Sequence, residues 1–136
     1  MLETRLLNTD DYDTLVSWWD GWKDWKGNAP PKEFLPQNGT GGIMISNDDV
    51  DICAGFLYTT NSKIAWLEFI VSNPNYRNKD RKEAIVMLID VLCNIANELG
   101  FKAVFTSVKN PFLINHLKNV GFSLEATKSY EMVKRW

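Results

Sequence analysis

One stretch of the chain, residues 67–85, constrains the fold more than any other. An apolar segment that predicts a β-strand runs into Asn73-Pro74, a short basic loop follows, and a long amphipathic helix begins with no second turn signal between them. The free N–H groups in the first turn of such a helix, together with its dipole, favour an anion. The pattern predicts a phosphate cradle, and a solvated, charged helix start is the alternative. The basic side chains of this loop are Arg77, Lys79, Arg81 and Lys82.

The composition is that of an ordinary globular domain. The chain of 136 residues is long enough for one domain, residues 1–136, with a single core. A net charge of −2 argues against a nucleic-acid partner, and no apolar run approaches the roughly 20 residues that span a bilayer. The first residues lack signal-peptide character, so we expect a cytoplasmic protein without membrane contact. Cys53 and Cys93 lie in apolar stretches and there is one histidine, so neither a disulfide nor a metal site is expected.

The hydrophobic periodicity predicts alternating strands and helices. Helices are expected after Thr9, after the basic loop and after Asn110, with a further short helical segment through Trp22 and Trp25. The order predicts an α/β (α+β) domain of three layers, in which about four helices flank a central mixed sheet of six to seven strands. The predicted strands cover residues 3–7, 43–46, 52–60, 64–72, 102–108, 122–126 and 130–136.

The stretch at residues 67–85 also resembles the acyl-CoA-binding segment of the GNAT superfamily of N-acetyltransferases. Three glycines that the family has in this segment are absent here. Glycine lets the backbone approach a phosphate closely, so their replacement predicts a modified cradle, and the negative charge of Asp80 is the least favourable change. The residues that carry the resemblance are Val71, Pro74, Tyr76 and Arg77, and those that replace the glycines are Asn78, Asp80 and Lys82.

A second segment supports the same resemblance, because Asn110, Gly121 and Phe122 fit the family's last helix and the element order agrees over nearly the whole chain. The resemblance implies a GNAT-like fold, with acetyl-CoA as cosubstrate. It also implies a distortion in the strand at residues 64–72 that splays this strand from the next one and admits acyl-CoA. The implied cofactor-binding residues are Phe69, Ile70 and Val71 through their backbone, Arg77, Asn78, Lys79, Asp80, Arg81 and Lys82 in the loop, and Asn110 and Phe112 at the last helix.

Acyl transfer to an amine needs a group that removes a proton from the nucleophile. Glu68 is the only acid on its strand, beside the place where the resemblance puts the thioester, so we predict that it is the base. The alternative is a structural position in which a neighbouring cation or indole satisfies the carboxylate. Many family members protonate the leaving thiolate with a tyrosine, and Leu117 occupies that position here. His116 is adjacent and is the candidate acid, although a lone surface histidine is more often incidental.

An aromatic cluster precedes the central strands. It contains more aromatic surface than one short helix usually buries, so core packing and acceptor or partner recognition are equal alternatives. In the second case Trp22, Trp25 and Phe34 bind the substrate, together with Tyr58 on a neighbouring strand. The cluster consists of Trp18, Trp19, Trp22, Trp25 and Phe34.

Together these inferences predict an N-acetyltransferase that transfers an acetyl group from acetyl-CoA to a primary amine by direct attack. The expected partners are acetyl-CoA and an amine acceptor whose identity the sequence does not give, and the protein is expected to be a monomer or a homodimer. The alternative is a catalytically decayed GNAT-fold module for binding or interaction, which Leu117 and the glycine-free loop favour. An unrelated α/β domain that shares only the element order is a third interpretation.

Overall fold

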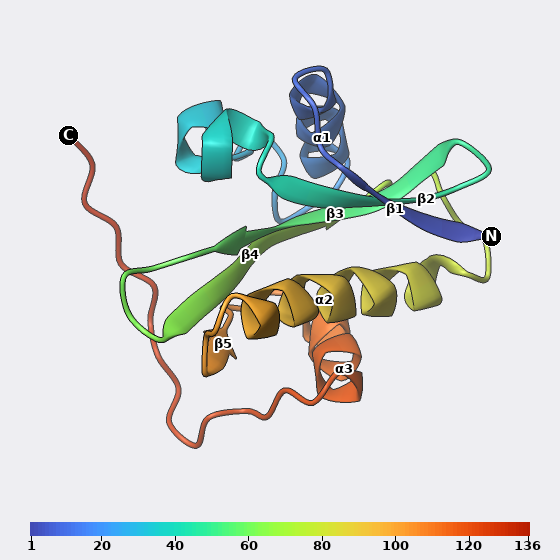
Figure 1. The fold of residues 1–136 in the computed structure, drawn as a ribbon. Helices are drawn as coiled ribbons and strands as arrows, with labels where there is room; N and C mark the ends of the chain where they lie inside the picture. Colours follow the sequence, from blue (N-terminus) through green and yellow to red (C-terminus); the bar gives the residue numbers. More distant parts are fainter.

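The computed structural model describes residues 1–136 and contains a five-stranded sheet covered by helices on both faces (Figure 1). Helix α1 lies on one face with two 3-10 helices, whereas α2 and α3 lie on the other. The predicted three-layer α/β architecture is therefore confirmed. The strands are β1 (Leu2–Leu6), β2 (Gly42–Asn47), β3 (Val50–Tyr58), β4 (Ile64–Ser72) and β5 (Ala103–Phe105). The helices are α1 (Asp11–Asp20), α2 (Arg81–Glu98), α3 (Pro111–Asn119) and the 3-10 helices η1 (Lys32–Phe34) and η2 (Pro36–Gly39).

The order of the strands in the sheet follows the order in the chain. Strands β1 to β4 pair antiparallel with their neighbours, and β5 pairs parallel to β4. A parallel pair needs a crossover, which α2 supplies after the loop that follows β4. The carboxyl end of β4 thus leads directly into the basic loop and the N-terminus of α2.

Each face of the sheet buries its own apolar cluster. On the α1 side, Leu15, Trp19 and Phe56 are fully buried. On the α2 side, the apolar residues whose spacing predicts this helix form the face that it buries against the sheet. None of the helices is long and apolar enough to cross a bilayer. The buried residues of α2 are Ala84, Ile85, Leu88, Ile89, Leu92 and Ala96.

The sheet has five strands, fewer than the six to seven that the sequence predicts. Residues 122–126 and 130–136 form no strand, and β5 ends at Phe105 instead of continuing to residue 108. The apolar side chains of this tail, such as Met132 and Trp136, are exposed. A strand is held by a ladder to a partner, and β5 pairs through only three residues, so no long ladder is present to order the tail.

The chain after α1 forms consecutive turns, so the fourth predicted helix is absent and the structure has three α-helices with two 3-10 helices. A Cβ atom on Gly21 would lie 2.6 Å from Cγ of Pro74, which shows how closely the end of α1 approaches the loop after β4. Backbone hydrogen bonds from Trp25 to Trp22 and from Asn28 to Trp25 then stabilise the turns. This packing places the segment beside the basic loop.

Candidate functional site

Strand β4 contains a β-bulge at its centre. Its pairing with β3 is regular up to Glu68 and resumes at Val71, so Phe69 and Ile70 together face the single residue Gly55. Phe69 has a φ of 56°, a left-handed conformation that is uncommon for a residue with a large side chain. This is the distortion that the resemblance implies for the strand.

The ladder between β4 and β5 ends just before the bulge. It comprises three residues on each strand, after which side chains replace backbone pairing. The hydroxyl of Thr106 donates a hydrogen bond to the carbonyl of Leu67, and the amide of Ser107 donates one to Oε1 of Glu68 at 3.0 Å. Beyond this point no strand pairs with β4 on the side of β5. We call residues 69–72 on this side the free edge of β4.

Glu68 lies at the start of this divergence and is half-buried. Burial raises its pKa from an ordinary value near 4.5 to about 7; the hydrogen bond from Ser107 opposes this change and the charge of Glu131 adds to it. A carboxyl group that titrates near neutral pH is suited to general acid–base chemistry. Burial, with a contribution from Glu68, also raises the pKa of Tyr58 to about 12, and its hydroxyl donates to the carbonyl of Phe34 at 2.7 Å.

The loop after β4 leads to a helix start that is open to a ligand. Among residues 77–83 only Arg81 donates a backbone hydrogen bond, to the carbonyl of Asn78 at 3.2 Å. The amides of Lys82 and Glu83 in the first turn of α2 have no acceptor in the protein. The four basic side chains lie around this turn, with Arg81 half-buried and the other three exposed. Open amides and cations together form an arrangement that can hold a phosphate.

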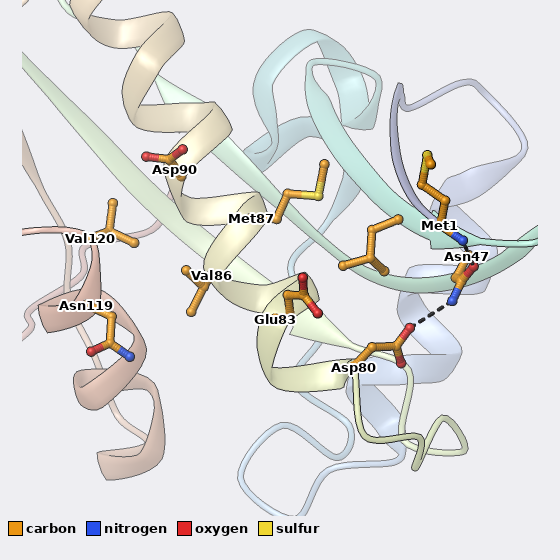
Figure 2. Close-up of a pocket in the computed structure, with 10 residues that line it drawn as sticks. Met1, Asn47, Asp80, Glu83, Val86, Met87, Asp90, Asn119 and Val120 are labelled. Atoms are coloured by element: carbon orange, nitrogen blue, oxygen red, sulfur yellow. Dashed lines mark hydrogen bonds between the residues drawn. The ribbon is translucent and has the colours of Figure 1, made fainter.

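The carboxylate of Asp80 points toward the end of β2. Oδ1 accepts a hydrogen bond from the hydroxyl of Tyr76 at 2.7 Å, and Oδ2 accepts one from Nδ2 of Asn47 at 2.8 Å. Both bonds lower the pKa of Asp80, and the bond from Tyr76 has the larger effect. The amino group of Met1 extends this series of hydrogen bonds by donating to Oδ1 of Asn47 at 2.7 Å (Figure 2). Asp80 therefore ties the start of α2 to the sheet.

A surface depression of about 720 Å³ lies beside these hydrogen bonds, between the first residues of the protein, α2 and the end of α3 (Figure 2). It contains no residue of β4, and it carries the carboxylates of Asp80, Glu83 and Asp90. Their negative charge disfavours the phosphates of a nucleotide ligand. No group of three or more His, Cys, Asp or Glu side chains is placed to hold a metal ion. The depression thus shares Asp80 and one side of α2 with the segment that the sequence analysis identifies, but it does not reach β4.

Helix α3 begins with two of the predicted cofactor-binding residues. Oδ1 of Asn110 accepts a hydrogen bond from the amide of Phe112 at 2.9 Å and so caps the helix. Both side chains are exposed, and Phe112 retains 78% of its accessible surface. The conformation of Asn110 is therefore explained by capping alone.

The next turn of α3 holds the candidate acid and its neighbour. Leu117 is only 3% exposed and belongs to the core beneath α2. His116 is half-buried, and its pKa is lowered by burial and by the positive charges of Lys82 and Arg81. His116 therefore lies near the basic loop, at the opposite end of the free edge from Glu68.

Aromatic rings from three parts of the chain gather over the bulge, and we call them the aromatic wall: Trp19, Trp25, Tyr58 and Phe69. The contacting rings have centroid separations of 6.0 to 6.4 Å. The indole N–H of Trp19 is buried within this group without an acceptor. From the loop after β5, the ammonium of Lys109 lies 4.8 Å from the centre of the Trp25 ring. The packing alternative is therefore visible in this cluster, because Trp19 is fully buried and Trp25, Tyr58 and Phe69 pack partly buried against the same core.

Sequence reasoning missed four residues of this site: Ser72, Thr106, Ser107 and Lys109. Their contacts depend on where the β4–β5 ladder stops and how the following loop folds back. The available signal was the polar Thr106-Ser107 pair, which follows three apolar residues inside the strand predicted at residues 102–108.

No protein-family profile matches the sequence, and no curated protein matches it. Solved structures do match, over nearly the whole chain. A transcriptional regulator from Bacillus halodurans C-125 has a TM-score of 0.73 at 12% identity, covering 98% of this chain and 100% of that one. A probable acetyltransferase from Staphylococcus epidermidis ATCC 12228 has a TM-score of 0.69 at 18% identity, covering 90% and 83%. AAC(6')-Iy in complex with the bisubstrate analogue CoA-S-monomethyl-acetylneamine has a TM-score of 0.62 at 18% identity, covering 99% of each chain.

These structures and the architecture described above establish that the chain has the fold of the GNAT acetyltransferases. At such identities the likeness concerns the fold alone. A transcriptional regulator shares this fold with acetyltransferases, so the fold alone does not specify an activity.

Proposed function

We propose that this protein binds acetyl-CoA along β4 and transfers its acetyl group to a primary amine. The observation that carries the proposal is that the bulge at Phe69, the free edge of β4 and the open helix start follow one another within residues 69–83. A ligand with a reactive thioester, an extended amide-bearing arm and an anionic end fits this order. AAC(6')-Iy, which has the same fold, holds a CoA-containing analogue.

The extended arm of acetyl-CoA fits the free edge of β4 as an added strand. Its amide groups can pair with backbone groups of Phe69, Ile70, Val71 or Ser72, which requires no particular side chains. The bulge supports this interpretation because a strand that diverges from β5 leaves backbone groups without a ladder partner.

The phosphates fit the first turn of α2. The amides of Lys82 and Glu83 and the helix dipole attract an anion, and Arg77, Lys79 and Arg81 supply charge-assisted hydrogen bonds. These amides lack acceptors although neither position is a glycine. The Asp80 carboxylate is held by Tyr76 and Asn47, which reduces the unfavourable effect of its charge.

Glu68 is the proposed base. An amine attacks only as the neutral species, so its ammonium form must lose a proton, and a carboxylate with a pKa of about 7 can accept it directly or through a water. The nitrogen then bonds to the thioester carbonyl carbon, and backbone N–H groups at the bulge can stabilise the negative charge that develops on the oxygen. The nitrogen, positively charged once it has bonded to carbon, releases its second proton to water, and the carbon–sulfur bond breaks so that the amide forms and the thiolate leaves.

The acid step does not depend on a residue at position 117, since Leu117 is part of the core. His116 remains the candidate acid from the sequence, but its lowered pKa favours the neutral imidazole at pH values where Glu68 is ionised. We therefore propose that the thiolate leaves unassisted or takes its proton from water.

The second candidate function is a binding module without catalysis. Two observations favour it: the tyrosine position is filled by Leu117, and the transcriptional regulator from Bacillus halodurans has the same fold. In that case we expect no acetyl transfer and weak or absent binding of acetyl-CoA.

Calorimetric titration with acetyl-CoA, followed by a thiol-release assay with a panel of amines, tests the proposal. We expect saturable binding that Arg81→Gln weakens about threefold to tenfold at low salt and less at high salt. Lys63→Gln is the matched control, because this cation lies in the hairpin between β3 and β4. Binding without thiol release would contradict catalysis, and no binding at millimolar acetyl-CoA would contradict the proposed function and favour the binding or interaction module.

A further inference from the structure

Trp22 connects the two ends of the candidate site. Its indole N–H donates a hydrogen bond to the carbonyl oxygen of Ser72 at 2.8 Å. The guanidinium carbons of Arg77 and Arg81 lie 5.8 and 5.0 Å from the centre of its ring, within the range of cation–π contacts. Arg81 also donates to the Ser72 hydroxyl at 3.3 Å. One half-buried side chain therefore contacts both the last residue of β4 and two cations of the loop.

The carbonyl of Ser72 belongs to the free edge of β4. The amide of the next residue, Asn73, donates to the carbonyl of Ile52 on β3 at 2.7 Å, so the backbone of Asn73 faces β3. Backbone groups of successive residues in a strand point to opposite sides. The Ser72 carbonyl thus faces the side that has no strand partner, and Trp22 occupies an acceptor that an added strand would use.

We propose that Trp22 latches the acyl-CoA site in the ligand-free protein and that acyl-CoA displaces its indole from Ser72. This inference rests on the proposed function. The pantetheine arm of CoA contains two amide N–H groups, and one of them replaces the indole N–H as the donor to Ser72. The phosphates in turn replace the Trp22 ring as the partner of Arg77 and Arg81. Ligand binding therefore exchanges these contacts rather than simply adding new ones.

The latch also reaches the acceptor side of the site. The turns at residues 21–27 are linked internally, because the amide of Trp25 donates to the carbonyl of Trp22 at 3.0 Å and the amide of Gly27 donates to the Asp20 carboxylate at 3.1 Å. Trp25 is part of the aromatic wall and lies 6.0 Å from Phe69 at the bulge, ring centre to ring centre. Displacement of Trp22 should therefore also shift Trp25 and the aromatic wall.

The substitution Trp22→Phe tests the latch, because it removes the indole N–H but keeps an aromatic ring near the arginines. Two probes are titrated by calorimetry: acetyl-CoA, and adenosine 3′,5′-bisphosphate, which is anionic but has no pantetheine arm. We expect the Kd of acetyl-CoA to fall about threefold to tenfold, the range for losing one competing hydrogen bond. The Kd of the bisphosphate should stay within about twofold. Trp136→Phe, at an exposed position in the tail, is the matched control.

A second measurement uses the parent protein, so the test does not depend on the folding of the variant. The indole N–H of Trp22 should exchange slowly with solvent in the free protein, because it is hydrogen-bonded. Saturation with acetyl-CoA should make its assigned NMR signal exchange faster, whereas adenosine 3′,5′-bisphosphate should leave it protected.

Each outcome decides between the two proposals. Tighter acetyl-CoA binding by Trp22→Phe, or loss of indole protection with acetyl-CoA alone, supports the latch. Unchanged or weaker acetyl-CoA binding by a folded variant, together with an indole that stays protected, overturns the latch but leaves the proposed function intact. If neither the parent nor Trp22→Phe binds acetyl-CoA, the proposed function fails and the latch fails with it.

Discussion

The substitution Glu68→Gln should make the protein more stable at alkaline pH and should lower the rate of the acetyl transfer that we propose. In the folded protein, burial holds the pKa of Glu68 at about 7, above its ordinary value near 4.5. The folded state therefore keeps this proton over a pH range in which the unfolded chain has released it. Stability from this group is fully present below about pH 4.5 and is lost as the pH rises through about 7.

The size of this effect follows from the two pKa values. A difference of about 2.5 corresponds to about 3.4 kcal/mol. Glu68 is only half-buried, so solvent screening reduces the expected effect to about 1–2 kcal/mol. Glutamine is neutral at every pH and can still accept the hydrogen bond from Ser107. Glu68→Gln should therefore be more stable than the parent by about 1–2 kcal/mol at about pH 8, with a smaller difference at about pH 4.5.

Urea unfolding of both proteins at the two pH values measures this difference in stability. Initial rates of thiol release measure the effect of the same substitution on turnover. Loss of a general base lowers turnover by about 10²–10⁴-fold, and the parent rate should rise with pH through about 7 while the variant rate does not. Equal stability of the two proteins at both pH values would refute the raised pKa. A stability difference without a rate difference would refute the catalytic role.

Three further substitutions test the surroundings of the site. Asp80→Gly should lower the melting temperature, since the hydrogen bonds from Tyr76 and Asn47 are lost, and calorimetry should show acetyl-CoA affinity within about twofold of the parent. Leu117→Tyr should destabilise the protein by about 1–3 kcal/mol in urea unfolding through overpacking, without faster thiol release; faster release would restore an acid role at this position. His116→Ala should keep the pH dependence of the parent rate, and loss of a limb of that profile would identify His116 as the acid.

The sequence predicts the layers of the fold well because they depend on local periodicity. The regularly spaced apolar residues from Ala84 to Ala96 form the face that α2 buries. Gly100, with a φ of 92°, lies just beyond the end of the helix. The tail was harder to predict. Residues 130–136 have a composition typical of a strand, but a strand forms only against a partner, and the sequence does not show that β5 is three residues long.

The arrangement of the site depends on contacts between distant residues and is therefore less visible in the sequence. The left-handed conformation of Phe69 arises from the register between β3 and β4, not from an intrinsic preference of phenylalanine. The direction of Asp80 is set by Asn47, which lies 33 residues earlier in the chain. The position of Glu68 on β4 could be read from the sequence, whereas its raised pKa requires the burial that the structure shows.

A crystal structure of the protein with bound CoA decides whether β4 is the acyl-CoA site. We expect the pantetheine arm to lie along the free edge of β4, residues 69–72, with the pyrophosphate against the amides of residues 77–83 and the sulfur near Glu68. The Trp22 indole should have left Ser72 in the same structure. Coenzyme A bound in the acidic depression beside α2, or anywhere else away from β4, would contradict the account.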